Sequence, residues 1–401
     1  MSDTWRIVEE EINKPSLFKS RESLMPEHLP DRLPHRDNEL RMLVSYFKHL
    51  VQDPGSISQR VLILGSVGTG KTALSKLFGK VFTRMAREKG YNIAYAHVNC
   101  HRNRTLFNVI YDIASQLSIP LPPRGLSAKE MFDVLLSYLS ELDMYLIVAL
   151  DEFHYFANVS KNDTVYFLAR TYDVYEGVKH LNFIFIATDA SKIAFLDPAT
   201  EGYILRHIIK LAPYTSQQLY DILRYRSSIS FHEGVYNDDV LRFIAEYEGV
   251  DKGGSGNARH ALEILLTAGD IAEKEGSSKI GIEHARKALS NLSREIVNIS
   301  EVIRYLSLHE LLVLLSIITL LRRSGKREIK MGEVEEEYRL LCESFNEIPR
   351  RHTQLYEYIQ ILSNAGVIST RPSGKGHRGR TTLITIHYGP LDLLENHIIE
   401  L

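Results

Sequence analysis

The chain has 401 residues, of which 44% are hydrophobic and 24% are charged. At about 150 residues per domain, this length predicts two or three folded domains, and the composition excludes disordered, collagen-like and disulfide-scaffold proteins. The 48 Lys and Arg residues nearly balance the 50 Asp and Glu residues, which leaves a formal net charge of -2. Binding to an acidic polymer would therefore depend on local clusters of cations rather than on the charge of the whole molecule.

Cysteine content and the hydrophobic runs favour an intracellular protein. Cys100 and Cys342 lie far apart and form no CxxC pair, which disfavours a disulfide framework or a four-cysteine zinc site. The start, MSDTWRIVEEEINK, lacks the basic and apolar regions of a secretory signal. The longest uncharged apolar run, 311–321, is shorter than the ~20 residues that span a bilayer. We therefore expect a buried helix there and no membrane partner.

Predicted elements divide the first three-quarters of the chain into three parts. Residues 1–25 are expected to form an N-terminal arm. Residues 26–213 contain five β-rich runs, VLILG, NIAYAHVN, YLIVALD, NFIFIAT and IIKLA, that alternate with amphipathic segments. This pattern predicts an α/β domain with a parallel sheet and crossover helices. Residues 214–296 lack such runs and begin with Thr215 and Gln218 in capping-box spacing, which predicts an all-α domain.

Residues 297–401 have the pattern of a winged-helix domain. Three helical patterns, at about 307–323, 332–346 and 350–364, precede two short β-like runs around 367–370 and 381–387. The glycine-rich sequence RPSGKGHRGR separates the two runs. Three helices followed by a basic hairpin are the elements of a winged helix.

The strongest motif is a phosphate-binding loop between the first predicted strand and a helical pattern. The sequence GSVGTGKT matches GxxxxGK[ST] in the strand–loop–helix context that the motif requires. Glycines allow the backbone to wrap around phosphate oxygens at a helix N-terminus, while Lys71 reaches the β- and γ-phosphates and the Thr72 hydroxyl binds Mg²⁺. The predicted nucleotide-binding residues of this loop are Gly65, Ser66, Val67, Gly68, Thr69, Gly70, Lys71, Thr72 and Ala73.

A possible metal cluster follows the second predicted strand. His97, Cys100 and His101 are close in sequence and are potential zinc ligands. Three such residues without a nearby fourth, beside a buried strand, are more often packing and polar rim residues. We therefore favour that interpretation over a zinc site.

The third predicted strand, YLIVAL, ends in Asp151 and Glu152. A carboxylate at the C-terminal end of a central strand lies where open α/β sheets bind ligands, so Asp151 is predicted to hold Mg²⁺ and Glu152 to activate the attacking water. The run DEFH also fits the DExH box of superfamily 2 helicases. That class needs a second sheet domain, whereas the residues after 214 have a helical pattern.

The last predicted helix and the basic hairpin are candidates for DNA contact. Leu355, Ile359 and Leu362 recur at helical spacing and should face the core, which leaves the N-terminal end of the helix to enter a major groove. An ordinary solvated basic loop is the alternative for the hairpin. The predicted DNA-binding residues of this region are Arg350, Arg351, Thr353, Gln354, Arg371, Lys375, Arg378 and Arg380.

Taken together and in order, these motifs resemble the archaeal origin-recognition and cell-division-control replication initiators, which are AAA+ ATPases with a C-terminal winged helix. Besides the loop and the Asp-Glu pair, the resemblance includes LPHRDNE at 33–39, RGLS at 124–127 and GNARHAL at 256–262. It covers residues 25–401. It implies a P-loop AAA+ base domain, an all-α lid domain and a winged-helix domain.

The resemblance also implies roles for individual residues. Arg259 matches the second-sensor arginine, which reaches the γ-phosphate, and Pro30, Leu33 and Arg36 would close over the adenine. Thr188 stands where the family carries a first-sensor asparagine; its shorter side chain predicts slow hydrolysis. Arg206 is the nearest candidate to act in trans on a neighbouring subunit, although a plain surface role is favoured. Arg124 and Lys129 lie where the family has an initiator-specific helix that contacts DNA.

We therefore expect a cytoplasmic, nucleoid-associated initiator that binds double-stranded origin DNA. ATP or ADP, with Mg²⁺, would act as a switch for origin binding and for loading of a replicative helicase, with paralogous initiator subunits as further partners. Two alternatives remain open. A winged-helix transcriptional regulator could use nucleotide as a ligand, and a signalling-type switch ATPase could use its winged helix for intramolecular packing.

Overall fold

The computed structural model describes residues 16–100, 102–120, 125–159, 179–189, 198–291, 302–324, 328–372 and 382–386, together with a few isolated positions. The chain forms two compact units, residues 1–288 and 289–401, which are described separately. No described helix is both long and apolar enough to cross a membrane.

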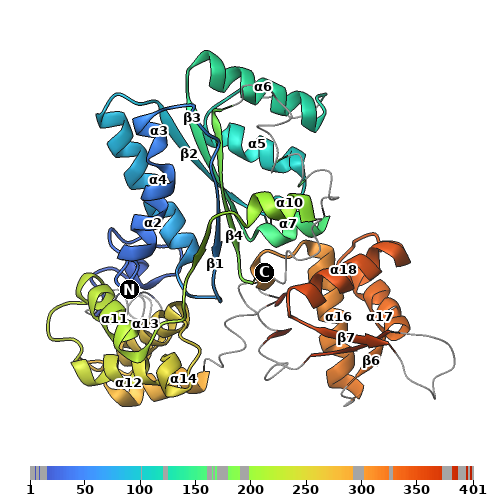
Figure 1. Cartoon of the computed structure of the whole chain (residues 1–401). Helices are drawn as coiled ribbons and strands as arrows, with labels where there is room; N and C mark the ends of the chain where they lie inside the picture. The colour runs from blue at the N-terminus through green and yellow to red at the C-terminus, as the bar shows by residue number, and fades with distance from the viewer. Residues whose placement is uncertain are drawn as a thin grey trace. The chain divides into compact units, whose positions relative to one another are not determined.

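The first unit is built on a five-stranded parallel sheet with the strand order β2-β3-β4-β1-β5 (Figure 1). Its strands are β1 (Arg60–Leu64), β2 (Ile93–Asn99), β3 (Tyr145–Asp151), β4 (Leu181–Ala187) and β5 (Ile208–Lys210). All five β-rich runs of the sequence form strands, so the predicted parallel α/β fold is confirmed. Because the strands are parallel, their carboxyl ends lie at one edge of the sheet, where ligands bind in such folds.

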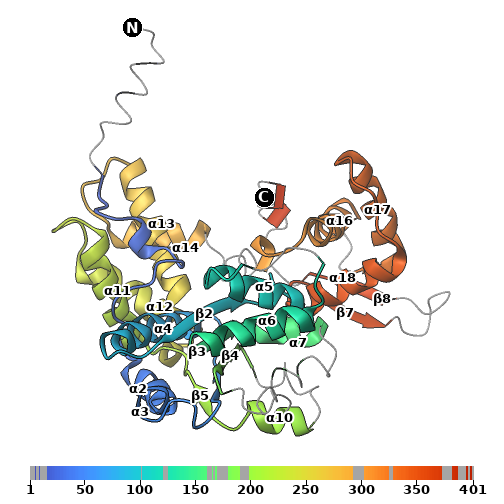
Figure 2. The same ribbon diagram turned by 90° about the horizontal axis from the view of Figure 1, so that it is seen from above.

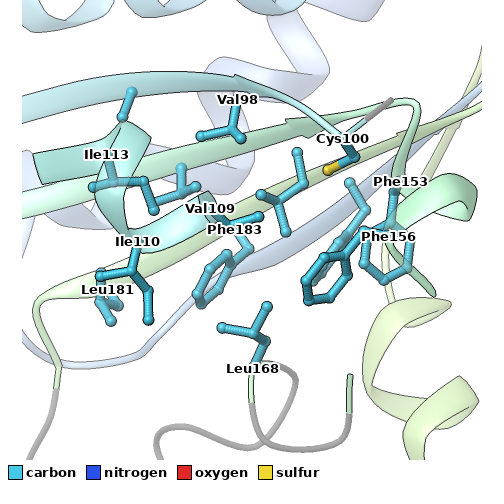
Figure 3. Close-up of a cluster of buried hydrophobic side chains, with 14 of the residues drawn as sticks. Val98, Cys100, Val109, Ile110, Ile113, Phe153, Phe156, Leu168, Leu181 and Phe183 are labelled. Atoms are coloured by element: carbon cyan, nitrogen blue, oxygen red, sulfur yellow. The ribbon is translucent and has the colours of Figure 1, made fainter. Parts of the chain in front are cut away.

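Helices cover both faces of this sheet (Figures 1 and 2). One face packs against α2 (Asp37–Phe47), α3 (His49–Gln52) and α4 (Lys71–Glu88). The other face packs against a second group, which consists of α5 (Leu106–Gln116), α6 (Ala128–Glu141), α7 (Phe153–Val159) and α10 (Pro198–Ile204). Figure 3 shows part of this second interface, where Phe153, Phe156 and Phe183 pack together with the buried Cys100. The strands are therefore buried on both sides, which explains their nearly continuous apolar sequences.

A helical lid follows β5 in the same unit. Its helices are α11 (Ser216–Ser230), α12 (Asp238–Glu248), the 3₁₀ turn η3 (Val250–Lys252), α13 (Ala258–Lys274) and α14 (Ile282–Asn291). Thr215 and Gln218 form the predicted capping box at the start of α11. The all-α character predicted for this region is confirmed.

The N-terminal residues 16–25, including the 3₁₀ turn η1 (Glu22–Leu24), pack on the lid helices. The Phe18 ring lies 4.9 Å from the Phe231 ring, and Gly269 of α13 leaves room for it, since a Cβ there would lie 2.5 Å from Phe18 Cζ. The backbone N–H of Leu17 donates to Glu273 Oε1 at 2.6 Å. The chain therefore contacts the lid before it enters the base domain.

The described part of the second unit combines helices with a small antiparallel sheet of the order β6-β8-β7. Its elements are α16 (Leu308–Ser324), β6 (Ile329–Lys330), α17 (Met331–Ser344), α18 (His352–Asn364), β7 (Ser369–Pro372) and β8 (Thr382–Thr385). Leu355, Ile359 and Leu362 are fully buried, as their spacing predicts. The winged-helix fold is confirmed, although the two-residue strand β6 has no counterpart among the predicted elements.

Candidate nucleotide and DNA sites

The phosphate loop connects the end of β1 to the first turn of α4. Gly68 and Gly70 have φ angles of 76° and 90°, in the left-handed region that favours glycine. Lys71 is buried, and its Nζ donates to the carbonyl oxygens of Gly65 at 2.7 Å and Ser66 at 2.9 Å. The ammonium group is thus held inside the curve of the loop. A bound phosphate would compete for the same donor hydrogens.

The other predicted loop residues divide by exposure. Ser66 and Val67 are exposed, while Thr69 is fully buried and its hydroxyl donates to Ser66 O at 2.8 Å. Ala73 follows Thr72 in the first turn of α4. The structure therefore places the nine predicted residues together in the loop and in the first turn of an 18-residue helix, which is the arrangement that binds phosphate through backbone N–H groups.

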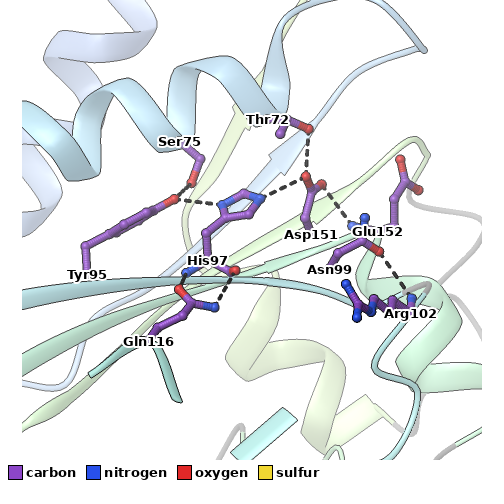
Figure 4. A network of polar contacts seen from close by, with 9 residues as sticks. All are labelled: Thr72, Ser75, Tyr95, His97, Asn99, Arg102, Gln116, Asp151 and Glu152. Carbon is purple, nitrogen blue, oxygen red and sulfur yellow. Dashed lines mark hydrogen bonds and ion pairs between the residues drawn. The ribbon is translucent and has the colours of Figure 1, made fainter. Parts of the chain in front are cut away.

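Asp151 lies beside Thr72 at the carboxyl edge of the sheet (Figure 4). The Thr72 hydroxyl donates to Asp151 Oδ2 at 2.7 Å, and His97 Nε2 lies 3.1 Å from the same oxygen. Burial by itself would raise the pKa of Asp151, but the hydrogen bonds from His97 and Thr72 and the charge of Lys71 outweigh it, so the pKa is lowered. The carboxylate is therefore ionised, and with the Thr72 hydroxyl it offers the hard oxygen donors that Mg²⁺ prefers.

Glu152 adopts an unusual backbone conformation directly after β3. Its φ angle is 52°, which is uncommon for a residue with a side chain, and its N–H donates to Asp151 Oδ1 at 2.9 Å. The half-buried carboxylate lies 3.5 Å from the Nδ1 of buried His154. Strain of this kind, about 1–3 kcal/mol, collects at functional sites, which fits the predicted role of Glu152.

The lid contacts the phosphate loop directly. The N–H of Ala258, the first residue of α13, donates to Gly68 O at 3.1 Å. Asn257 caps the same helix through its Oδ1, which accepts from the N–H groups of Arg259 at 3.0 Å and His260 at 3.1 Å. A Cβ on Gly68 would lie 1.7 Å from that oxygen. The half-buried Arg259 therefore starts from a turn of the lid that contacts the loop.

Arg36 holds the phosphate loop and the base–lid connection together. Its guanidinium donates to Thr69 O at 3.1 Å and to Ala212 O at 2.7 Å, and it lies 4.0 Å from the centre of the Tyr214 ring. Pro30 is buried, and Leu33 packs against the apolar cluster beneath α2 and α4. These contacts place the segment beside the loop. A contact of Pro30, Leu33 or Arg36 with adenine stays a prediction.

Thr188 and Arg206 occupy opposite edges of the sheet. Thr188 directly follows β4 at the carboxyl edge, and its hydroxyl is buried without a hydrogen-bond partner among the described residues. Arg206 is exposed in the turn between α10 and β5, at the amino edge. Arg206 thus lies at the edge opposite the phosphate loop of its own chain, and a role in trans stays a prediction.

The described residues contain no group of three His, Cys, Asp or Glu side chains that could hold a metal ion. Complete burial raises the pKa of the Cys100 thiol well above its usual value, which disfavours the thiolate that zinc requires. Both ring nitrogens of His97 contact protein groups, Tyr95 and Asp151. His101 lies outside the described residues. The packing interpretation is therefore preferred to a zinc site.

The predicted DNA-binding residues of the tail are only partly described. Arg350, Arg351, Thr353 and Gln354 are exposed around the N-terminus of α18. Arg371 on β7 pairs with Glu328, since its Nε and Nη2 donate to the two carboxylate oxygens at 2.7 and 2.6 Å, and its contact with DNA stays a prediction. Lys129 is exposed in the first turn of α6. The remaining candidates, Lys375, Arg378, Arg380 and Arg124, lie outside the described residues.

Three family models match successive parts of the chain. An AAA domain matches residues 58–191, a Cdc6 AAA+ ATPase-type lid domain matches residues 220–290, and a CDC6 C-terminal winged-helix domain matches residues 301–396. The ORC1-type DNA replication protein 2 of Saccharolobus solfataricus is 45% identical over 96% of this chain and 94% of its own. The corresponding protein of Sulfurisphaera tokodaii is 43% identical over 98% and 94%. The chain belongs to the ORC1-type family of DNA replication proteins.

Solved structures of this family have the same fold. The Aeropyrum pernix ORC1 protein in complex with DNA is 29% identical, with a TM-score of 0.74 over 96% of this chain and 97% of its own. The A. pernix ORC2 protein, solved as ADPNP–ADP complexes, is 28% identical, with a TM-score of 0.66 over 96% and 98%. The archaeal initiator family expected from the motifs is therefore confirmed, and the DExH helicase interpretation is excluded.

Tyr214, Asn257 and Tyr95 belong to this site, although the sequence motifs predicted no role for them. Tyr214 lies under Arg36, its N–H donates to Gly256 O at 3.1 Å, and a Cβ on Gly70 would lie 3.1 Å from its hydroxyl. Asn257 links the lid to the loop, and Tyr95 contacts His97. A signal was available for two of them, because Asn257 stands at an N-cap position and Tyr95 and His97 alternate on one face of a strand.

Proposed function

We propose that this chain is a replication initiator whose Mg²⁺-dependent binding and slow hydrolysis of ATP set how it engages origin DNA. The observation that carries the proposal is the meeting of loop and lid, where Ala258 N donates to Gly68 O beside Arg259. A nucleotide whose phosphates lie against the loop would touch both parts of the first unit. The triphosphate and diphosphate forms would then favour different lid orientations, as a population shift requires.

The nucleotide site contains the groups that phosphoryl transfer needs. Lys71 would bind the β- and γ-phosphates, and Arg259 would bind the γ-phosphate with its planar fork of donors. Thr72 and Asp151 would hold Mg²⁺, which when bound neutralises charge on the phosphate oxygens. The Glu152 carboxylate would accept a proton from the attacking water. Thr188, shorter than an asparagine, would orient that water poorly, and hydrolysis would be slow.

The second unit would bind duplex DNA through α18 and the wing. Exposed Arg350, Arg351, Thr353 and Gln354 surround the end of α18 that enters the major groove in this fold. Arginine side chains there can bind phosphate or guanine, and Gln354 can bind adenine. The related ORC1 protein was solved in complex with DNA, which supports DNA binding by this chain. Paralogous initiators and a replicative helicase are the partners that we propose.

Footprinting on genomic fragments, with ATP and with ADP, tests the proposal. We expect protection at replication origins whose extent differs between the two nucleotides, and no difference for Lys71→Ala. Protection confined to promoters would favour a transcriptional regulator. Absence of salt-dependent duplex binding would favour a signalling ATPase.

A further inference from the structure

Asp151 is held by a chain of polar side chains that crosses three elements of the base domain (Figure 4). The Ser75 hydroxyl of α4 lies 2.9 Å from the Tyr95 hydroxyl of β2, which lies 2.9 Å from His97 Nδ1. His97 Nε2 in turn lies 3.1 Å from Asp151 Oδ2. The chain therefore starts one helical turn after the phosphate loop and ends at the predicted magnesium ligand.

The direction of the last bond follows from the chemistry of its partners. Both oxygens of the Asp151 carboxylate accept from protein donors, Oδ1 from the Glu152 N–H and Oδ2 from the Thr72 hydroxyl, so the His97 Nε2 beside Oδ2 is the donor and carries the hydrogen. Burial raises the pKa of Tyr95 far above its usual value, so its hydroxyl keeps its proton and occupies the other ring nitrogen. Gln116 also brackets the His97 backbone, accepting from its N–H and donating to its C=O, both at 2.9 Å. The imidazole is thus fixed in place and in orientation.

The packing of α4 on β2 preserves this geometry. Gly79 stands in the middle of α4, although glycine there destabilises a helix by about 1 kcal/mol relative to alanine. A Cβ on Gly79 would lie 2.4 Å from Tyr95 Cγ, so only glycine lets the aromatic ring lie against the helix. A helix-weakening residue is therefore present where the tyrosine ring needs space.

We propose that His97, supported by Tyr95 and Ser75, is a positioning residue that orients the Asp151 carboxylate for Mg²⁺ and thereby couples Mg²⁺ to nucleotide binding. This inference rests on the proposed nucleotide function. His97 acts through Asp151, as outer-shell partners of metal-binding carboxylates do; removing such a partner typically weakens metal binding about 10–100-fold.

Calorimetric titration with ADP, in EDTA and in saturating Mg²⁺, measures this coupling as the ratio of the two affinities and requires no turnover. For His97→Leu we expect the ratio to fall at least tenfold while the affinity in EDTA is unchanged. Tyr95→Phe, which removes only the hydroxyl, should lower the ratio about threefold. His180→Leu is the matched control: its side chain is 19% exposed against 12% for His97, and it precedes β4 at the opposite edge of the sheet.

An unchanged ratio in a folded His97→Leu variant would overturn the proposal. If that variant does not fold, the same ratio is compared between His97→Gln and His97→Asn. The amide of glutamine can reach the position of Nε2, whereas the shorter asparagine cannot. Glutamine should then retain the coupling that asparagine loses, and equal ratios would contradict a positioning role. Failure of wild-type protein to bind ADP under either condition would instead remove the proposed nucleotide function.

Discussion

The nucleotide site and the winged-helix end place their polar groups in opposite ways. In the base domain Lys71, Thr72 and Asp151 lie in a shielded network, where each polar atom has fixed partners. At the end of α18, Arg350 and Arg351 are exposed to solvent. When a shielded polar group loses its partner, water cannot reach it to replace the lost hydrogen bond. The interactions of exposed cations are instead weakened by dissolved salt. We therefore expect large effects of substitutions at the first site and graded, salt-dependent effects at the second.

The largest effect is expected for Lys71→Ala. Removal of the ammonium should weaken ATP binding at least a hundredfold, because charged hydrogen bonds contribute about 1.5–3 kcal/mol each. Lys76→Ala is the matched control, since Lys76 is exposed on the same helix. Calorimetry with ATP and Mg²⁺ measures the difference, and equal affinities in the two variants would remove the contrast between the two regions.

A graded effect is expected for Arg350→Ala combined with Arg351→Ala. If each arginine neutralises one phosphate, the slope of log affinity against log salt should become shallower by about two. The loss of duplex affinity between 50 and 200 mM salt should then be about tenfold smaller in the double variant than in the wild type. Fluorescence anisotropy at several salt concentrations measures this slope, and an unaltered slope would place DNA contact elsewhere.

Glu328→Ala extends the test of the winged-helix end, because the carboxylate of Glu328 forms an ion pair with the guanidinium of Arg371. Removing it should free Arg371 for phosphate, raise duplex affinity and steepen the salt slope by about one. Arg371→Ala in the wild-type background should change the slope by less than that. If Arg371→Ala instead causes the larger change, the ion pair opens readily on DNA.

Within the first unit, Asn257→Ala should lower stability by about 1–2 kcal/mol, because Oδ1 of Asn257 caps α13. Asn237→Ala provides the control, since Asn237 occupies the same position on α12 without a side-chain capping bond. Thermal denaturation of both variants with and without ADP separates capping of α13 from a role in nucleotide binding. If ADP stabilises Asn257→Ala as much as it stabilises the wild type, this residue acts only as a helix cap.

The smallest effect on the fold is expected at Thr188. Thr188→Val removes a buried hydroxyl that has no hydrogen-bond partner among the described residues, so stability should stay equal or rise by about 1 kcal/mol. Single-turnover hydrolysis should also be unchanged in this variant, whereas Thr188→Asn should accelerate it about tenfold. A slower Thr188→Val enzyme would show that the threonine hydroxyl acts in hydrolysis.

The two regions also differ in how far sequence predicts them. The loop and the Asp-Glu pair were predictable because their chemistry lies in short contiguous motifs, and the five strands because both faces of the sheet are buried. The pairing of Arg371 with Glu328 was not predictable from the sequence. Glu328 directly precedes β6, which has only two residues and joins the sheet through β8. The contact between His97 and Asp151 depends on the pairing of β2 with β3, in which Asn99 faces Asp151. Partners that meet only through sheet register leave little local signal.

The central claim, that the lid binds the nucleotide, is tested most directly by the ATP and ADP affinities of wild type and Arg259→Ala. Because the arginine is expected to bind the γ-phosphate, its removal should reduce the preference for ATP over ADP about tenfold while ADP affinity changes less than twofold. Arg224→Ala, which removes an exposed arginine of α11, should leave both affinities unchanged. An ATP preference that survives intact in Arg259→Ala would contradict a nucleotide held between the phosphate loop and the lid.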